Sequence, residues 1–107
     1  MKQLAQRYFD AWNLNSITEL KPCLSDTVTL EDWEISKTGL QEVLDANQKI
    51  FDDTPGISVT VENMDFHNNT VIAQITVDAE TFEEPLAVLD VLTVDDNKIT
   101  SIKAFKR

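Results

Sequence analysis

Hydrophobic residues recur at the spacing of amphipathic helices in the first half of the chain. Tyr8 and Trp12 lie on one such apolar face near the start of the sequence. Ser16 and Glu19 have the spacing of a capping box, which predicts a short second helix whose regularity Pro22 limits. The predicted helices cover residues 2–12, residues 16 to about 24, and residues 38–51, the last opened by Thr38 and Gln41.

The other segments alternate between apolar and polar residues, as strands with one buried face do. The expected strands cover residues 27–32, 57–66, 70–79, 85–94 and 99–106, with turns at 67–69 and 95–98. Helices followed by a meander of strands predict an α+β fold, with three N-terminal helices packed on a curved antiparallel sheet. With 107 residues, the chain is expected to form one domain, residues 1–107.

Acidic residues outnumber basic ones strongly enough to exclude some partners. The net charge is −10, and the stretch between Lys49 and Lys98 contains eleven acidic residues and no basic one. Binding to nucleic acid or to an anionic membrane needs clustered lysines and arginines, so neither partner is expected. The plainest interpretation of the acidity is a surface that keeps the protein in solution.

Three further features narrow the class of protein. Cys23 is the only cysteine, which excludes an internal disulfide and a metal site built from thiolates. No apolar run approaches the roughly 20 residues that cross a bilayer. The first residues show helical periodicity in place of the apolar core of a secretion signal, so a cytoplasmic location is expected.

Two acidic residues occupy positions where the strand pattern places apolar side chains. Asp32 shares its strand face with Val28 and Leu30, and Asp90 is the only charged residue of the segment 85–94. An unpaired buried carboxylate is costly, and burial raises the pKa of a carboxyl so that the neutral acid is favoured. Alternatively, such a residue lies at a sheet edge or a dimer rim, or accepts hydrogen bonds from backbone N–H groups.

Tyr8 places a hydroxyl on the apolar face of the first predicted helix. It is the only tyrosine of the chain, and a buried phenol needs a hydrogen-bond partner inside the protein. If its tip reaches solvent instead, Tyr8 is an ordinary core aromatic. Together, Tyr8, Asp32 and Asp90 are candidates for a polar site within an apolar pocket.

The order of elements and three stretches of sequence resemble the nuclear-transport-factor-2-like superfamily, which includes the SnoaL-like proteins and the ketosteroid isomerases. The stretches are YFDAW, LSDTVTLEDW and VLDVLTVDDNKITSIKAF. The resemblance covers nearly the whole chain and implies a cone-shaped, cystatin-like fold. It is sharpest to the ketosteroid isomerases, in which a tyrosine and a protonated aspartic acid hydrogen-bond the substrate carbonyl and a second aspartate moves the proton.

Position by position, the resemblance places the tyrosine at Tyr8, the proton-moving aspartate at Asp32 and the protonated aspartic acid at Asp90. It implies an isomerase that moves a proton next to the carbonyl of a small apolar substrate, with no cofactor and no metal. It also implies a homodimer formed through the sheet, in keeping with the two apolar faces of the segment 85–94. The alternative is a non-catalytic module of the same fold that binds a ligand or only dimerises.

The pocket around these three residues is expected to be lined by inward side chains of the helices and strands. They are Trp12, Leu24, Val28, Leu30, Trp33, Asn47, Phe51, Val88 and Leu92. Leu24 and Asn47 stand where the ketosteroid isomerases have further tyrosines, so the hydrogen-bond relay of that family is incomplete here.

Other enzyme chemistries of this fold lack the residues they need. The only histidine, His67, falls in a predicted turn, which disfavours a dehydratase or a nucleophile activated by histidine. An epoxide hydrolase-like site needs an arginine in the pocket, and the chain contains only Arg7 and Arg107.

Overall fold

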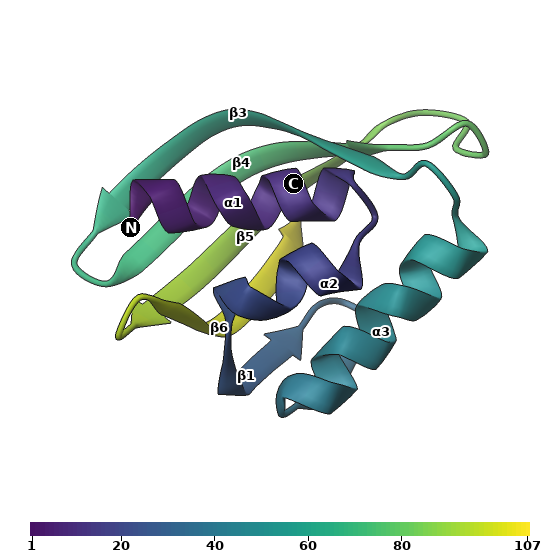
Figure 1. The fold of residues 1–107 in the computed structure, drawn as a ribbon. Helices are drawn as coiled ribbons and strands as arrows, with labels where there is room; N and C mark the ends of the chain where they lie inside the picture. Colours follow the sequence, from purple (N-terminus) through teal and green to yellow (C-terminus); the bar gives the residue numbers. More distant parts are fainter.

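The computed structural model describes residues 1–107, which form three α-helices, one short 3₁₀-helix and six strands (Figure 1). In chain order the elements are α1 (Lys2–Asn13), α2 (Ile17–Leu20), the 3₁₀-helix η1 (Lys21–Cys23), β1 (Leu24–Glu31), β2 (Ser36–Thr38), α3 (Leu40–Asp53), β3 (Ser58–His67), β4 (Thr70–Asp78), β5 (Leu86–Asp95) and β6 (Lys98–Lys106). All three α-helices lie on one side of a curved sheet (Figure 1), which confirms the predicted α+β class.

The six strands form one sheet in the order β2-β1-β6-β5-β4-β3. All neighbouring strands are antiparallel except β1 and β6, which run parallel. The sheet is therefore mixed, and the expectation of a wholly antiparallel sheet is wrong at this one pairing. Strand β1 precedes α3 and the whole meander, and a strand separated from its partner by so long a connection can pair in parallel.

The second helical segment is shorter than the sequence predicts, although its start is as expected. Ser16 accepts a hydrogen bond from the Glu19 N–H at 3.2 Å and so caps α2. Pro22 then places the chain in η1, whose end at Cys23 leads directly into β1. Strand β1 therefore begins at Leu24, where the pattern predicted the end of a helix.

The predicted start of the third helix is wrong by two residues. Thr38 belongs to β2 and its N–H donates to the Glu42 carboxylate at 3.1 Å, so it forms no capping box with Gln41. The helix begins after Gly39, whose φ of +93° suits a residue without a Cβ atom. Strand β2 has only three residues, too few to show an alternating pattern.

Two asparagines fasten the C-terminal end of α1 to the edge of the sheet. Asn13 donates to the Val59 carbonyl at 3.0 Å and accepts from the Val59 N–H at 2.6 Å. Asn15 donates to the Ile57 carbonyl at 2.9 Å. These amides occupy the position of a neighbouring strand on the edge strand β3. They hold the last turn of α1, with Trp12, over the concave face of the sheet.

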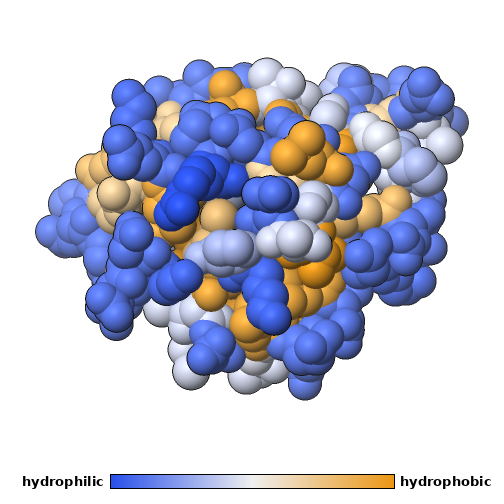
Figure 2. Space-filling model, in the orientation of Figure 1, coloured by the Kyte–Doolittle hydropathy of each residue, from blue (hydrophilic) through white to orange (hydrophobic).

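The apolar core lies between the helices and the sheet. Figure 2 shows that the helix-side surface is mostly hydrophilic, with hydrophobic residues visible between α2 and α3. The largest fully buried side chains are Phe9, Leu4, Leu20, Leu92, Ile99, Val28, Val43 and Val71. None of the helices combines the length and the apolar character that a membrane crossing requires.

Candidate active site

A cavity of about 400 Å³ opens between α1, α3 and the concave face of the sheet. Tyr8 reaches it from α1, Asp90 from β5, and Asp32 from the residues that follow β1. The structure therefore brings the three candidate residues, which are far apart in sequence, to one cavity. Its volume lies within the range of small-molecule sites.

The expected pocket lining divides into two groups. Five of the proposed residues line the cavity, namely Trp12, Leu30, Trp33, Asn47 and Val88. Four do not, because they are packed inside the protein away from it, and this corrects the prediction for Leu24, Val28, Phe51 and Leu92. Each of these four residues is at least 95% buried, as are the lining residues Tyr8 and Val88, so burial alone does not separate the two groups.

The Asp90 carboxyl is buried among apolar side chains, with only 7% of the residue exposed. Burial, and secondarily the negative charge of Asp32, raises the pKa of Asp90 from 3.8 to about 7. The Asp90 carboxyl has no hydrogen-bond partner within the protein that would shift its pKa. Every fully enclosed polar side-chain atom of the chain does have a partner, so the Asp90 oxygens are not fully enclosed. The carboxyl oxygens therefore face the cavity, and the raised pKa of Asp90 favours the neutral acid, which can donate a hydrogen bond.

The strand register places the two candidate carboxyls at one level of the sheet. Asp90 on β5 pairs with Ala104 on β6. Leu30 on β1 pairs with Ile102 on β6, so the next inward position along β1, Asp32, falls beside Ala104. Strand spacings of about 4.8 Å put the two aspartate backbones roughly 10 Å apart. Because Ala104 is small, the space between the carboxyls is left open.

Asp32 lies just beyond the end of β1, in a turn that its own side chain organises. Its Oδ1 accepts hydrogen bonds from the backbone N–H groups of Glu34 at 2.7 Å and Ile35 at 2.8 Å. The Asp32 N–H in turn donates to the Ile35 carbonyl at 3.0 Å. This turn holds the carboxylate at the cavity wall, and Oδ2 makes no hydrogen bond within the protein. The alternative of a carboxylate bound by backbone N–H groups thus applies to one oxygen of Asp32.

The Tyr8 side chain is buried, and its ring packs edge-on against Phe9 with ring centres 5.1 Å apart. Burial, followed by the charges of Asp90 and Cys23, raises the pKa of the Tyr8 hydroxyl well above its usual value of 10.0. The phenol therefore stays protonated, and it makes no hydrogen bond within the protein. Since it lines the cavity, its free donor is available to a ligand there.

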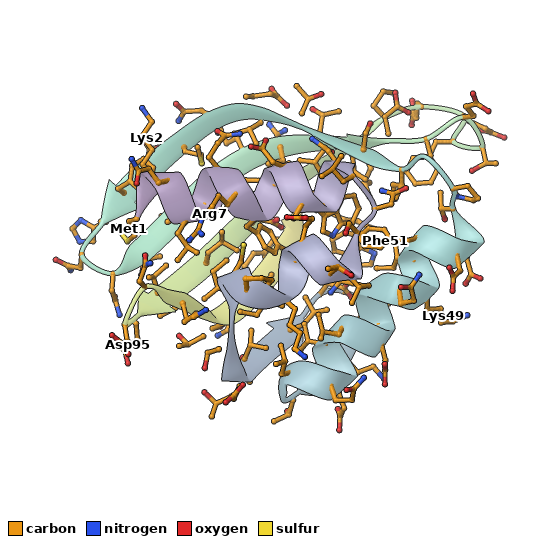
Figure 3. The ribbon with its side chains drawn as sticks, viewed as in Figure 1. Met1, Lys2, Arg7, Lys49, Phe51 and Asp95 are labelled. Carbon is orange, nitrogen blue, oxygen red and sulfur yellow. The ribbon has the colours of Figure 1, made fainter.

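A partly buried hydrogen-bonded pair supports the cavity wall between α1 and α3. Trp12 Nε1 donates to Asn47 Oδ1 at 3.0 Å, and Asn47 Nδ2 donates to the Val43 carbonyl at 2.8 Å. Phe51 points from α3 toward the same end of α1 (Figure 3) and packs edge-on against Trp12 with ring centres 5.3 Å apart. Asn47 thus joins Trp12 to α3, with its Oδ1 and one hydrogen of its Nδ2 engaged in the wall.

Several lining residues were not anticipated from the sequence. Lys106 lines the cavity from β6, with its Nζ 4.9 Å from the centre of the Trp33 ring. Because Lys106 lies two residues after Ala104 on an alternating strand, the sequence could have indicated that the two side chains share the inward face. Phe82 lies in the loop between β4 and β5, where no periodic pattern indicates the direction of a side chain.

The sequence model of the SnoaL-like domain family matches residues 5–102, nearly the whole chain. The chain belongs to the SnoaL-like domain family. Its fold is the cone-shaped, nuclear-transport-factor-2-like α+β fold that the sequence resemblance implied. In this SnoaL-like domain the cavity lies inside the cone, on the concave side of the sheet.

Solved structures with the fold of this SnoaL-like domain include candidate enzymes of several classes. A candidate polyketide cyclase from Sinorhizobium meliloti has a TM-score of 0.89 at 14% identity, covering 97% of this chain and 94% of that one. A candidate ketosteroid isomerase from Kribbella flavida has a TM-score of 0.84 at 22% identity, covering 98% and 76%. An LEH-like epoxide hydrolase from Mycobacterium tuberculosis has a TM-score of 0.83 at 15% identity, covering 98% and 80%.

These structural similarities establish the fold of the SnoaL-like domain, since all three identities lie below 25%. No curated protein sequence matches the chain. The chemistry of this domain therefore has to be argued from its own cavity.

Proposed function

We propose that this SnoaL-like domain is an isomerase that moves a proton next to the carbonyl of a small, largely apolar molecule. The observation that carries the proposal is the convergence of Tyr8, Asp32 and Asp90 on one cavity of about 400 Å³. Such a reaction needs a base near the carbon that loses its proton and hydrogen-bond donors at the oxygen that becomes anionic. The three side chains supply these functions without a cofactor.

In the proposed reaction, the substrate carbonyl oxygen accepts hydrogen bonds from the Tyr8 hydroxyl and from the neutral Asp90 carboxyl. The Asp32 carboxylate removes a proton from the carbon between the carbonyl and a carbon–carbon double bond. The electron pair of that C–H bond moves into the carbonyl group and gives a dienolate. Asp32, now protonated, returns the proton to the far end of the double bond, and a conjugated ketone results with no net change in atoms or charge.

The charge state of Asp90 is central to this proposal, because the cavity already contains the Asp32 carboxylate. An ionised Asp90 would repel the developing enolate, whereas a neutral Asp90 donates to it. A pKa of about 7 keeps a substantial neutral population at neutral pH. Tyr8, whose pKa is raised further still, remains a donor throughout this range.

The direct test of the proposed function is the isomerisation of an unconjugated cyclohexenone to its conjugated isomer, followed by ultraviolet absorbance. The protein is expected to accelerate this reaction, and Tyr8→Phe, which removes one donor while keeping the ring, should lower kcat. Incorporation of deuterium from heavy water at the carbon next to the carbonyl reports the same proton transfer. The absence of both isomerisation and exchange over a panel of such ketones would overturn the proposal.

A second candidate function is ligand binding without catalysis. It is favoured by the bonding of Asp32, because one of its oxygens is already occupied by two backbone N–H groups. It is also favoured by Asn47, because an amide bonded to Trp12 and Val43 stands where the ketosteroid isomerases have a tyrosine hydroxyl. A phenol such as 2-naphthol should then bind to the cavity while no ketone of the panel exchanges its protons.

We also propose that the protein forms a homodimer through the outer face of the sheet. Four apolar side chains meet there in register, since Leu89 pairs with Phe105 and Val91 pairs with Ile72. Phe105 is 52% exposed, so a large apolar side chain of this group is open to solvent. A second copy of the chain would cover this apolar patch, defined as Ile72, Leu89, Val91 and Phe105.

Light scattering after gel filtration tests this assembly. The protein is expected to have the mass of a dimer at micromolar concentration, and Phe105→Glu should convert it to a monomer by burying a charge in the apolar patch. Leu14→Glu is the matched control, because Leu14 is an exposed apolar residue following α1, on the opposite side of the sheet. A wild-type monomer, or a dimer that survives Phe105→Glu, would contradict the proposal.

A further inference from the structure

A basic side chain without an acidic partner lies at the rim of the cavity. The Lys106 ammonium rests above the ring of Trp33, 4.9 Å from its centre. The two ion pairs of the structure join Lys49 to Asp53 and Arg107 to Glu62, so no carboxylate lies within 4 Å of Lys106. The ammonium therefore makes a cation–π contact with the indole ring, and its N–H groups donate no hydrogen bond within the protein.

The neighbouring Arg107, in contrast to Lys106, has a side chain that is held by several hydrogen bonds at this end of the sheet. Its guanidinium donates to the Val88 carbonyl at 3.0 Å, to the Ile75 carbonyl at 2.6 Å and to the Glu62 carboxylate at 2.7 Å. Arg107 thus fastens the end of the chain to β3, β4 and β5. Lys106 has no comparable role, which leaves its charge available to a ligand.

The strand register places Lys106 at a definite distance from the proposed oxyanion site. Ala104 lies beside Asp90, and Lys106, the next inward position of β6, lies beside Val88. Two residues along a strand span about 7 Å. A ligand whose carbonyl oxygen meets Tyr8 and Asp90 would therefore present a group roughly 7 Å further along the sheet to Lys106.

Lys106 is the point of the cavity lining at which an anionic group is best accommodated. It is the only basic residue of the lining, whereas Asp32 and Glu34 would repel an anion elsewhere in the cavity. A cation over an indole ring in contact with water is held only weakly, whereas an ammonium–carboxylate hydrogen bond is stronger. A carboxylate entering the cavity mouth can therefore draw the ammonium from Trp33, and the exposed ring remains to pack on the apolar body of the ligand.

We propose that Lys106 determines specificity for a carbonyl compound with a carboxylate at the end remote from its enolisable carbonyl, that is, an oxo acid with an apolar body. This inference rests on the proposed function, because it assumes that the carbonyl is bound by Tyr8 and Asp90. It adds the class of substrate, which the three residues of the acid–base site leave open.

Two naphthol probes test this assignment by calorimetry at about pH 6, below the raised pKa of Asp90. They are 6-hydroxy-2-naphthoate and its methyl ester, which share a phenol for Tyr8 and Asp90 and have, at the far end of the ring system, a carboxylate and a neutral ester respectively. The wild-type protein is expected to bind the carboxylate about five- to tenfold more tightly than the ester. Lys106→Gln should abolish this preference, and Lys106→Arg should largely keep it.

Lys103→Gln is the matched control, because Lys103 is an exposed lysine on the same strand, paired with Val91 on the outer face of the sheet. It should leave the preference for the carboxylate unchanged. Equal binding of the two probes by the wild-type protein, or an unchanged preference in Lys106→Gln, would overturn the assignment of Lys106.

Tyr8→Phe separates this outcome from a failure of the proposed function. If Tyr8→Phe weakens both probes while Lys106→Gln changes nothing, the oxyanion site stands and only the substrate class is wrong. If neither probe binds, or if Tyr8→Phe leaves both affinities unchanged, the phenol is not at the oxyanion site and both proposals fail.

Discussion

Replacing Asp32 with Asn is expected to slow the isomerisation of the unconjugated cyclohexenone by about 100- to 10,000-fold, the usual contribution of a general base. Asn has nearly the size of Asp, and its side-chain oxygen can still accept from the N–H groups of Glu34 and Ile35. The turn after β1 should therefore keep its form while the amide cannot take up a proton. The loss should appear in kcat, measured by ultraviolet absorbance.

Glu34→Gln is the matched control for this experiment, since Glu34 is the neighbouring carboxylate at the same cavity rim. It should change kcat little. The affinity of 2-naphthol, measured near pH 6, should stay close to that of the wild-type protein in both variants. A variant Asp32→Asn that retains most of its activity, or an equal loss in Glu34→Gln, would show that Asp32 is not the base.

Replacing Asp90 with Asn is expected to stabilise the fold in alkaline solution while impairing activity. The pKa of Asp90 rises from 3.8 to about 7 on folding, so between these pH values the folded chain binds more protons than the unfolded chain. The free energy of unfolding therefore falls as the pH rises from about 4 to about 7 and is then level, a total loss of about 3 to 4 kcal/mol from this group. Asn is neutral at every pH and avoids this loss.

Denaturant unfolding of the two proteins measures the effect. The stabilities of Asp90→Asn and the wild-type protein should be similar near pH 4, and at pH 8 the variant should be more stable by about 3 to 4 kcal/mol. Asp95→Asn, at the exposed end of the same strand, should show no such divergence. If Asp90→Asn is equally stable at pH 8, or less stable there, Asp90 is not held as a buried acid without a partner.

The sequence pattern was sufficient to single out the candidate acids, because an alternating strand assigns each residue to a face. Asp90 stands out as the only charge on an otherwise apolar strand, and its burial in the structure follows from that position. Tyr8 could be placed in the same way from the helical period. The face on which a residue lies, however, does not indicate how far along the cone its side chain is placed.

Val88 and Leu92 illustrate this limit, since they flank Asp90 on the same inward face of β5. Val88 lines the cavity, whereas Leu92 lies in the closed part of the cone and is fully buried. The alternating pattern treats the two positions alike, so it could not indicate that Val88 reaches the cavity and Leu92 does not. The difference depends on where the helices cross the sheet, which is a matter of tertiary packing.

The parallel pairing of β1 with β6 was beyond the reach of local patterns for a similar reason. About 70 residues separate the two strands, and nothing in either segment specifies the direction of its partner. This pairing nevertheless sets the site, because it puts Asp32 beside Ala104 and so at the level of Asp90. It also brings Lys106 near the turn that contains Trp33.

Whether Asp90 is a neutral hydrogen-bond donor can be measured by titrating its carboxyl by carbon-13 NMR in the folded protein, with Asp90→Asn used to assign its signal. The carboxyl is expected to titrate near pH 7, with a lower pKa in Asp32→Asn because the neighbouring charge has been removed. A pKa close to the ordinary value of about 4 would rule out Asp90 as a donor, since it would then be ionised at neutral pH and unable to donate to a carbonyl oxygen.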